Sequence, residues 1–89
     1  MTGFPLFEII YHRHAAQDLP SISKDNQNRI KHAVENKLGR APQDFGEPLR
    51  RSLKGHWKLR VGDWRVIYKI EGKTVIVLRI GHRREIYER

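Results

Sequence analysis

The sequence predicts an α+β domain of the order β-α-α-β-β-β-β, with two N-terminal helices packed on one face of a twisted, mainly antiparallel sheet. In the second half, basic and apolar residues alternate between glycine-containing turns, which is typical of half-buried strands. Residues 14–38 instead carry apolar side chains at helical spacing. At 89 residues, the chain has room for one modest core, so we expect a single domain over residues 1–89.

The positive charge is concentrated in the strand-rich half. Residues 1–48 hold six Lys/Arg and six Asp/Glu, whereas residues 49–89 hold twelve Lys/Arg and four Asp/Glu, so the formal net charge of +8 lies in the second half. Such a chain is expected to bind a polyanion: nucleic acid, an anionic membrane or an acidic protein. Its apolar fraction of 38% is modest and leaves room for a partner to cover part of the apolar surface.

Several classes of protein are excluded by simple features. There is no cysteine, so disulfides and thiolate metal sites are ruled out, and no P-loop or dinucleotide-binding fingerprint occurs. No segment approaches the roughly 20 apolar residues that span a bilayer. His12 and His14 have no nearby carboxylate or cysteine partner, so we predict no metal site. We expect a soluble cytoplasmic protein without a cofactor or a membrane partner.

The N-terminal third predicts one strand and one short helix. The β-branched and aromatic run at residues 7–11 follows Pro5 and favours a strand. Residues 14–19 favour a short helix, which Pro20 should stop because proline cannot donate a backbone N–H.

A longer helix is predicted to run to Leu38, capped by Ser21 or Ser23. Gly39 is the expected residue after the helix, in the left-handed conformation that glycine adopts without penalty. The stripe that this helix should bury consists of Ile22, Ile30, Ala33, Val34 and Leu38.

The second half predicts four strands after a loop at residues 40–48. The strands are expected at 49–53, 57–61, 64–70 and 74–80, joined by Lys54-Gly55, by Gly62-Asp63 and by the three residues 71–73. A glycine that leads a two-residue connection suits a type II′ hairpin turn, so the last three strands should form an antiparallel meander.

Alternation along these strands sorts the side chains onto two faces. The apolar set, expected to pack on the helices, is Trp57, Leu59, Val61, Trp64, Val66, Tyr68, Ile70, Ile76, Leu78 and Ile80. The opposite set, expected to share one open face, contains the cations Lys58, Arg60, Arg65, Lys69 and Arg79, together with Ile67, Val75 and Val77.

A basic face with proton carriers at its edge can bind or cleave a phosphodiester. Cleavage without a metal needs a base, cations that hold the developing charge, and an acid for the leaving oxygen. Arginine suits the second task because its planar fork binds phosphate oxygens in pairs. His56, His82 and Tyr87 are the candidate proton carriers, and RNA would supply its own 2′-hydroxyl nucleophile. Phosphate binding without catalysis remains the alternative at this point.

Four blocks of residues match a known pattern: Leu53-Lys54-Gly55, Lys58-Leu59-Arg60, the run from Gly62 to Tyr68, and the run from Ile80 to Tyr87. With these blocks, the chain resembles the RelE/ParE superfamily of bacterial and archaeal toxins over nearly its whole length. The resemblance implies the toxin of a toxin–antitoxin pair, bound by a cognate acidic antitoxin. The RelE branch cuts messenger RNA in the ribosomal A site, whereas the ParE branch shares the fold and poisons DNA gyrase. We favour the RelE branch, with mRNA and the ribosome as partners.

The resemblance also implies a site. By position, Arg65, Arg83 and Tyr87 match the sheet arginine, the arginine after the last strand and the C-terminal tyrosine of RelE-type enzymes, and His82 is held as the substitute base. His56 stands where the best-known ribosome-dependent member has lysine, and the segment between Gly81 and Tyr87 is shorter here. The expected phosphate-binding set is Lys54, His56, Lys58, Arg60, Lys69, Arg79 and Arg84.

Overall fold

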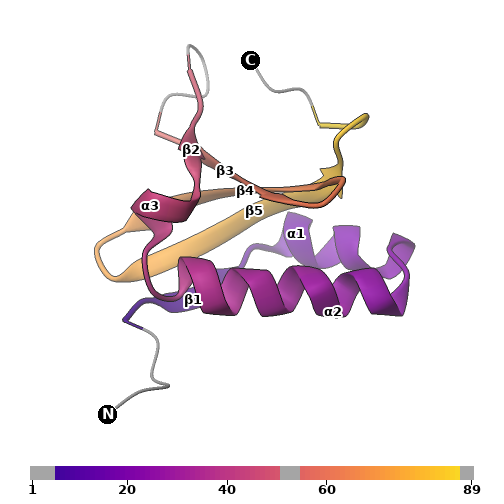
Figure 1. Ribbon diagram of the computed structural model, residues 1–89, viewed down its shortest axis with the longest axis horizontal. Coiled ribbons are helices and arrows are strands. Elements are labelled where there is room, and N and C mark those ends of the chain that lie inside the picture. The colour runs from indigo at the N-terminus through magenta and orange to yellow at the C-terminus, as the bar shows by residue number, and fades with distance from the viewer. Residues whose placement is uncertain (1–5, 51–54, 87–89) are drawn as a thin grey trace.

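The computed structural model describes residues 6–50 and 55–86, and its two main helices lie on one side of a five-stranded sheet (Figure 1). The strand order is β1-β5-β4-β3-β2, and β1 runs parallel to β5 while the other pairs are antiparallel. The predicted fold class is thereby confirmed. The elements are β1 (Glu8–Tyr11), α1 (Arg13–Asp18), a 3₁₀ turn η1 (Leu19–Ser21), α2 (Lys24–Ala33), a π turn η2 (Val34–Leu38), α3 (Pro42–Phe45), β2 (Glu47–Pro48), β3 (Trp57–Val61), β4 (Trp64–Glu71) and β5 (Thr74–His82).

Side-chain caps set the beginnings of both main helices. The Nδ1 atom of His12 accepts a hydrogen bond from the N–H of His14 at 3.1 Å and caps α1. The hydroxyl of Ser23 accepts from the N–H of Asn26 at 3.3 Å and caps α2, which decides between the two serines that the sequence left open. The predicted stripe of α2 and η2 is confirmed, because four of its members are buried and Ala33 packs against them.

The end of the second helix differs from the prediction. Gly39 has a φ of −67°, so the expected left-handed conformation is wrong. The N–H of Gly39 donates to the carbonyl of Val34 at 3.1 Å, five residues back, and this wider π turn lets the chain leave the helix with right-handed dihedrals.

Residues 40–48 are not a plain loop as predicted. They hold the short helix α3, which begins at Pro42, and the two-residue edge strand β2. The strand expected at 49–53 is wrong in position. The strand that pairs with the start of β3 is β2, at residues 47–48, and Leu49 and Arg50 lie outside β2. Residues 51–53 lie outside the described part of the chain.

The last three strands form the predicted meander. Gly62 and Gly72 each have a φ of +60°, as their turns require. The connection between β4 and β5 is Gly72-Lys73, one residue shorter than expected, because β4 extends to Glu71.

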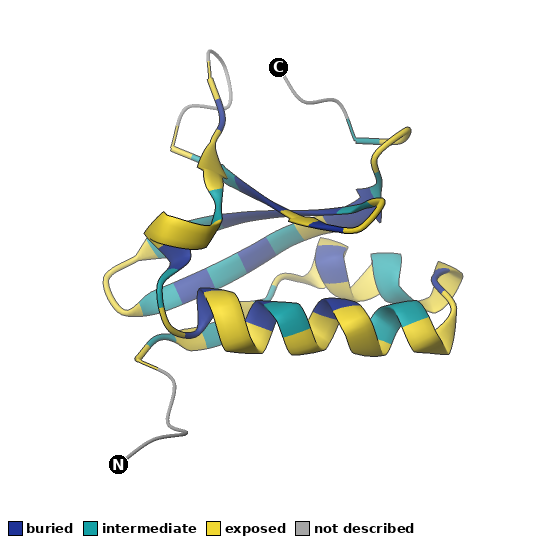
Figure 2. Ribbon diagram, in the orientation of Figure 1, coloured by how far each residue is buried: buried dark blue, intermediate teal, exposed yellow. Residues whose placement is uncertain are grey.

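The core lies between the helices and the facing side of the sheet, where buried residues recur along β4 and β5 (Figure 2). On β5 the predicted sides are wrong for its first part: Val75 and Val77 are buried in the core, whereas Ile76 and Leu78 are only partly buried. The cause is a β-bulge, because Tyr68 pairs with Val77 but its neighbour Ile67 pairs with Arg79, and Leu78 is the extra residue.

Candidate nucleic-acid interface

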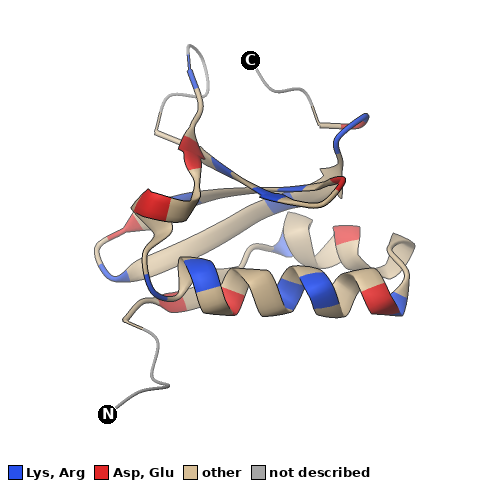
Figure 3. Cartoon of the chain, in the orientation of Figure 1, with Lys and Arg blue, Asp and Glu red and all other residues tan. Residues whose placement is uncertain are grey.

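The predicted basic face exists on the side of the sheet away from the helices. In the register, Lys58 pairs with Ile67, Ile67 with Arg79, and Arg60 with Arg65. Cross-strand partners share a face, so these four cations lie on the same side of the sheet. Figure 3 shows basic residues along β3 and β4 above the helical layer.

This face is less open than predicted. Lys58 and Arg65 are buried, with 7% and 8% of their surface exposed, so the expectation of an open cluster is wrong for its two central members. The Nη1 atom of Arg65 donates to the carbonyls of Gly62 and Trp64, at 3.0 Å each. These hydrogen bonds compensate for burial of the charge and fix the guanidinium against the β3–β4 turn.

A carboxylate that the sequence analysis missed lies among these cations. The Oε1 atom of Glu47 is 3.5 Å from Nζ of Lys58 and 3.8 Å from Nη2 of Arg60. Glu47 lies directly opposite Lys58 in the β2–β3 pair. It was missed because residues 40–48 were predicted as a loop and not as part of the sheet.

The outer cations of the basic face are engaged in ion pairs. Nζ of Lys69 lies 2.9 Å from Oε2 of Glu71. Nε of Arg79 lies 2.9 Å from Oδ2 of Asp18, at the end of α1. Both pairs are partly exposed, so a polyanion can compete for the cations at small cost.

The β3–β4 turn brings together the two arginines predicted to be catalytic. The backbone N–H of Arg83 donates to the carbonyl of Asp63 at 2.8 Å. In the side chains, Nε of Arg83 lies 3.7 Å from Oδ1 of Asp63. Arg65 contacts Gly62, the other residue of this turn. Arg83 remains largely exposed, whereas Arg65 is buried.

His82 lies apart from these arginines. In the β4–β5 pair, His82 lies opposite Trp64, on the face of the sheet that carries Val66 and Ile80 and not on the face that carries Arg65. The rings of His82 and Trp64 meet edge-on, with their centroids 5.6 Å apart. Its Nδ1 atom accepts a hydrogen bond from the N–H of Arg84 at 3.2 Å.

The remaining predicted site residues are scattered around the sheet. His56 is half-buried just before β3, and its carbonyl accepts from the N–H of Leu49 at 2.8 Å. Arg84 is exposed in the turn after β5. Lys54 and Tyr87 lie outside the described residues, so the roles predicted for the site stay predictions.

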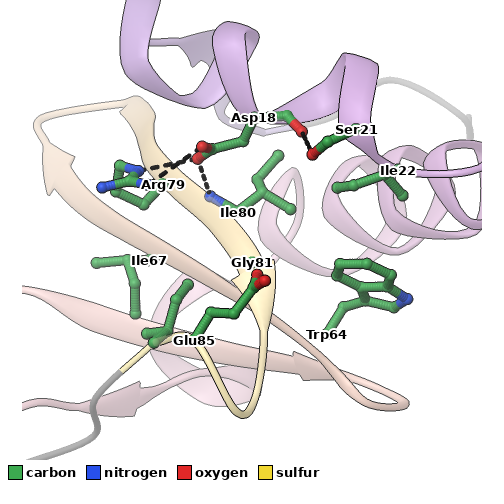
Figure 4. A pocket seen from close by; sticks show the side chains of 10 residues that line it. Asp18, Ser21, Ile22, Trp64, Ile67, Arg79, Ile80, Gly81 and Glu85 are labelled. Carbon is green, nitrogen blue, oxygen red and sulfur yellow. Dashed lines mark hydrogen bonds and ion pairs between the residues drawn. The ribbon is translucent and has the colours of Figure 1, made fainter.

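A cavity of about 310 Å³ lies beside the outer edge of β5 (Figure 4). Apolar side chains from β4, β5 and the C-terminal turn form much of its wall, and Asp18, Arg79 and Glu85 add charged groups. The sequence analysis missed this cavity, because α1 and the C-terminal turn meet there only through the fold.

Within residues 6–50 and 55–86, no three His, Asp or Glu side chains gather in a way that could hold a metal ion. None of the helices in this part of the chain is long and apolar enough to cross a membrane.

The fold and the basic sheet face define a class of protein. The family described as the ParE toxin of the type II toxin–antitoxin system parDE matches residues 9–87. The chain therefore belongs to this family of type II toxin–antitoxin toxins.

Individual toxins and toxin–antitoxin complexes are similar to this chain. Toxin RelG of Mycobacterium tuberculosis is 44% identical over 54 residues, which cover 58% of this chain and 62% of RelG, less than two thirds of that relative. The toxin–antitoxin complex RelBE2 of the same organism contains a chain 31% identical with a TM-score of 0.83, and the match covers 89% of this chain and 99% of that one. YafQ of E. coli is 25% identical with a TM-score of 0.68 over 91% of this chain and 98% of its own.

Proposed function

We propose that this toxin is a metal-independent endoribonuclease that cleaves messenger RNA at the ribosome and stops translation in the cytoplasm. The observation that carries the proposal is the convergence of Arg65 and Arg83 on the β3–β4 turn, beside a basic sheet face. The similarity to RelG and to the RelBE2 toxin supports the RelE branch over the gyrase-poisoning branch.

The proposed reaction needs no cofactor. The 2′-hydroxyl of the RNA attacks the adjacent phosphorus and loses its proton to a base, and the bond to the 5′-oxygen of the next nucleotide breaks. That oxygen takes up a proton, which leaves a 2′,3′-cyclic phosphate and a free 5′-hydroxyl. Arg65 and Arg83 would stabilise the extra negative charge on the phosphorane-like transition state. Arg65 is suited to this because its hydrogen bonds to two carbonyls hold its guanidinium in place before substrate binds.

Tyr87 is our proposed base. An ordinary phenol is a weak base at neutral pH, and the guanidinium groups of Arg65, Arg83 and Arg84 would favour its ionised form. His82 is less suited to the task, because its Nδ1 already accepts a backbone hydrogen bond and the proton of the neutral ring must then be on Nε2. In that tautomer Nε2 is a hydrogen-bond donor and has no lone pair with which to take up the proton of the 2′-hydroxyl.

The proposed protein partner is a cognate acidic antitoxin. The solved relative RelBE2 is a toxin–antitoxin complex. In this chain, an acidic segment could neutralise the basic sheet face and cover the exposed apolar side chains of Ile10 and Phe45.

Mapping messenger RNA 5′ ends after induction of the toxin in a host cell tests the proposal. New ends inside coding regions, together with a rapid fall in protein synthesis, are expected. Purified mRNA incubated with the toxin, with and without ribosomes, then tests the ribosome requirement. Intact mRNA accompanied by double-strand DNA breaks and an SOS response would refute the proposal and identify gyrase as the target.

A further inference from the structure

The outer edge of β5 is closed by carboxylates instead of by a strand. β1 pairs with β5 only as far as Val77, and β5 continues to His82. Beyond β1, Oδ2 of Asp18 accepts from the N–H of Ile80 at 2.8 Å, and Oε1 of Glu85 lies 3.4 Å from the N of His82. Both backbone donors are thus already directed to side chains, which disfavours the addition of another strand at this edge.

These two carboxylates stand at the wall of the 310 Å³ cavity (Figure 4). Its apolar wall includes Trp64, Ile67 and Ile86. Small-molecule sites span about 300–1,000 Å³. This cavity lies at the lower end, so a flat group of the size of a nucleobase suits it better than a larger ligand.

The two carboxylates differ in how many hydrogen bonds they already accept. Asp18 accepts from Nε of Arg79 at 2.9 Å, from Nη2 of Arg79 at 3.2 Å and from the N–H of Ile80 at 2.8 Å. Among residues 6–50 and 55–86, Glu85 accepts only the long contact from the N–H of His82, and it is exposed. A carboxylate offers about four acceptor positions. Glu85 is therefore the group that can accept hydrogen bonds from a ligand.

The cavity adjoins the proposed cleavage site. Gly81 lines the cavity and is the cross-strand partner of Arg65. Ile86 packs over Gly81 so closely that a Cβ at that position would lie 2.9 Å from its Cγ1 atom. A base held in the cavity would therefore lie next to a phosphate held by Arg65 and Arg83.

We infer that this cavity is a nucleobase subsite in which Glu85 reads guanine in the bound messenger RNA. Guanine is the base whose Watson–Crick edge presents two adjacent donors, N1–H and N2–H, to the two oxygens of one carboxylate. Adenine and cytosine present an unprotonated ring nitrogen there, and uracil flanks its single N–H with carbonyl oxygens. The apolar wall would pack on the faces of the base. The inference rests on the proposed ribonuclease function and specifies its substrate preference.

Nucleotide binding to the isolated protein tests the subsite without catalysis. Trp57→Phe leaves Trp64, in the cavity wall, as the fluorescent reporter. In this background, 5′-GMP is expected to bind about tenfold more tightly than 5′-IMP, which lacks only the N2 amino group, and AMP more weakly still. The amide signal of Gly81 in the unsubstituted chain provides the same comparison by NMR if Trp57→Phe does not fold.

Glu85→Gln is expected to reduce the preference for GMP over IMP to less than about twofold, because a neutral amide cannot accept both hydrogen bonds. The matched control is Glu8→Gln, which removes one negative charge at an exposed position of β1 and should leave the preference unchanged. Equal binding of GMP and IMP, no binding of any nucleotide, or an unaltered preference in Glu85→Gln would overturn the inference.

These results are separable from the proposed function. If the toxin leaves all mRNA intact but GMP binds through Glu85, the cleavage proposal fails and the guanine subsite stands. If mRNA is cleaved without any enrichment of guanine next to the cut, and Glu85→Gln has the same cleavage pattern, the ribonuclease stands and the subsite fails.

Discussion

Asp18 and Arg79, which are 61 residues apart in the chain, form a two-bond ion pair between the end of α1 and the second half of β5, with Nε–Oδ2 at 2.9 Å and Nη2–Oδ1 at 3.2 Å. The hydrogen bond to Asp18 and its negative charge raise the pKa of Arg79 further above its usual value. Because Asp18 also accepts from the backbone of Ile80, it fastens the helical layer to a stretch of strand that β1 does not reach.

The two partners of this ion pair should differ in their contribution to stability. Asp18→Ala leaves the part-buried N–H of Ile80 without its acceptor and is expected to cost about 1–3 kcal/mol of the free energy of unfolding. Arg79→Ala removes only the ion pair of an exposed side chain and should cost less than about 1 kcal/mol. Urea unfolding measures both. Equal losses in the two variants would show that the edge hydrogen bond contributes little.

Arg65→Lys tests whether the buried guanidinium acts in the reaction. Lysine keeps the charge but cannot reproduce the planar fork, so we expect a fall in cleavage rate of about a hundredfold, equivalent to roughly 2.7 kcal/mol of transition-state stabilisation. The circular dichroism spectrum should be unchanged. The matched control is Arg13→Lys, an exposed position on α1, where full activity is expected. Single-turnover cleavage near the rate of the unsubstituted chain in Arg65→Lys would remove Arg65 from the proposed mechanism.

Tyr68→Phe is expected to destabilise the fold. The phenol of this buried residue donates to the carbonyl of Pro42 at 2.6 Å and connects β4 to α3. Loss of the donor leaves a buried carbonyl unpaired, at a cost of about 1–3 kcal/mol. For a domain of this size, each kcal/mol lowers Tm by roughly 4–8 °C. Calorimetry would contradict the assignment if Tm were unchanged.

Tyr11→Phe should behave in the opposite way at neutral pH. In the described part of the chain, the hydroxyl of Tyr11 is buried without a hydrogen-bond partner, so removing it is expected to leave stability equal or slightly higher. Burial, followed by the charge of Glu35, raises the pKa of Tyr11 from 10.0 to about 12.

The raised pKa also predicts a pH dependence. The folded state holds the phenolic proton of Tyr11 more tightly than the unfolded state does. The contribution of this proton to the free energy of unfolding is therefore complete below pH 10 and is lost as the pH rises towards 12. The free energy of unfolding of the unsubstituted chain should therefore fall relative to Tyr11→Phe over that interval. Tyr68 is present in both chains and cancels in the comparison. Parallel pH profiles of the two chains would contradict the prediction.

Most of the fold could be predicted from local pattern. The apolar stripe from Ile22 to Leu38 and the glycines of the two hairpin turns determined the main elements without tertiary information. Which residues of β5 face the core could not be predicted. Residues 75–78 are all apolar, so the pattern fits equally well with the odd-numbered or the even-numbered residues inside. The left-handed residue at Gly39 was predicted for an ordinary helix end, and the π turn that replaced it is not signalled by any residue type in the sequence.

The candidate site was predictable in its residue types but not in its contacts. Alternation alone identified the side of the sheet that carries Lys58 and Arg65. Their burial, the approach of Glu47 from an edge strand, and the meeting of Arg65 and Arg83 at one turn depend on segments that are distant in sequence. The same is true of the cavity, whose wall is formed by three separate parts of the chain.

The bulge at Leu78 behaves as a single-residue insertion in an otherwise regular strand. With it, two consecutive positions, Leu78 and Arg79, separate the buried Val77 from the buried Ile80. Deletion of Leu78 would restore simple alternation and keep Arg79 outside and Ile80 inside. The insertion therefore does not change which of Arg79 and Ile80 faces the core. It instead increases the twist of β5 at the point where its pairing with β1 ends. The extra residue thereby changes the direction in which β5 enters the turn that carries Arg83 and Glu85.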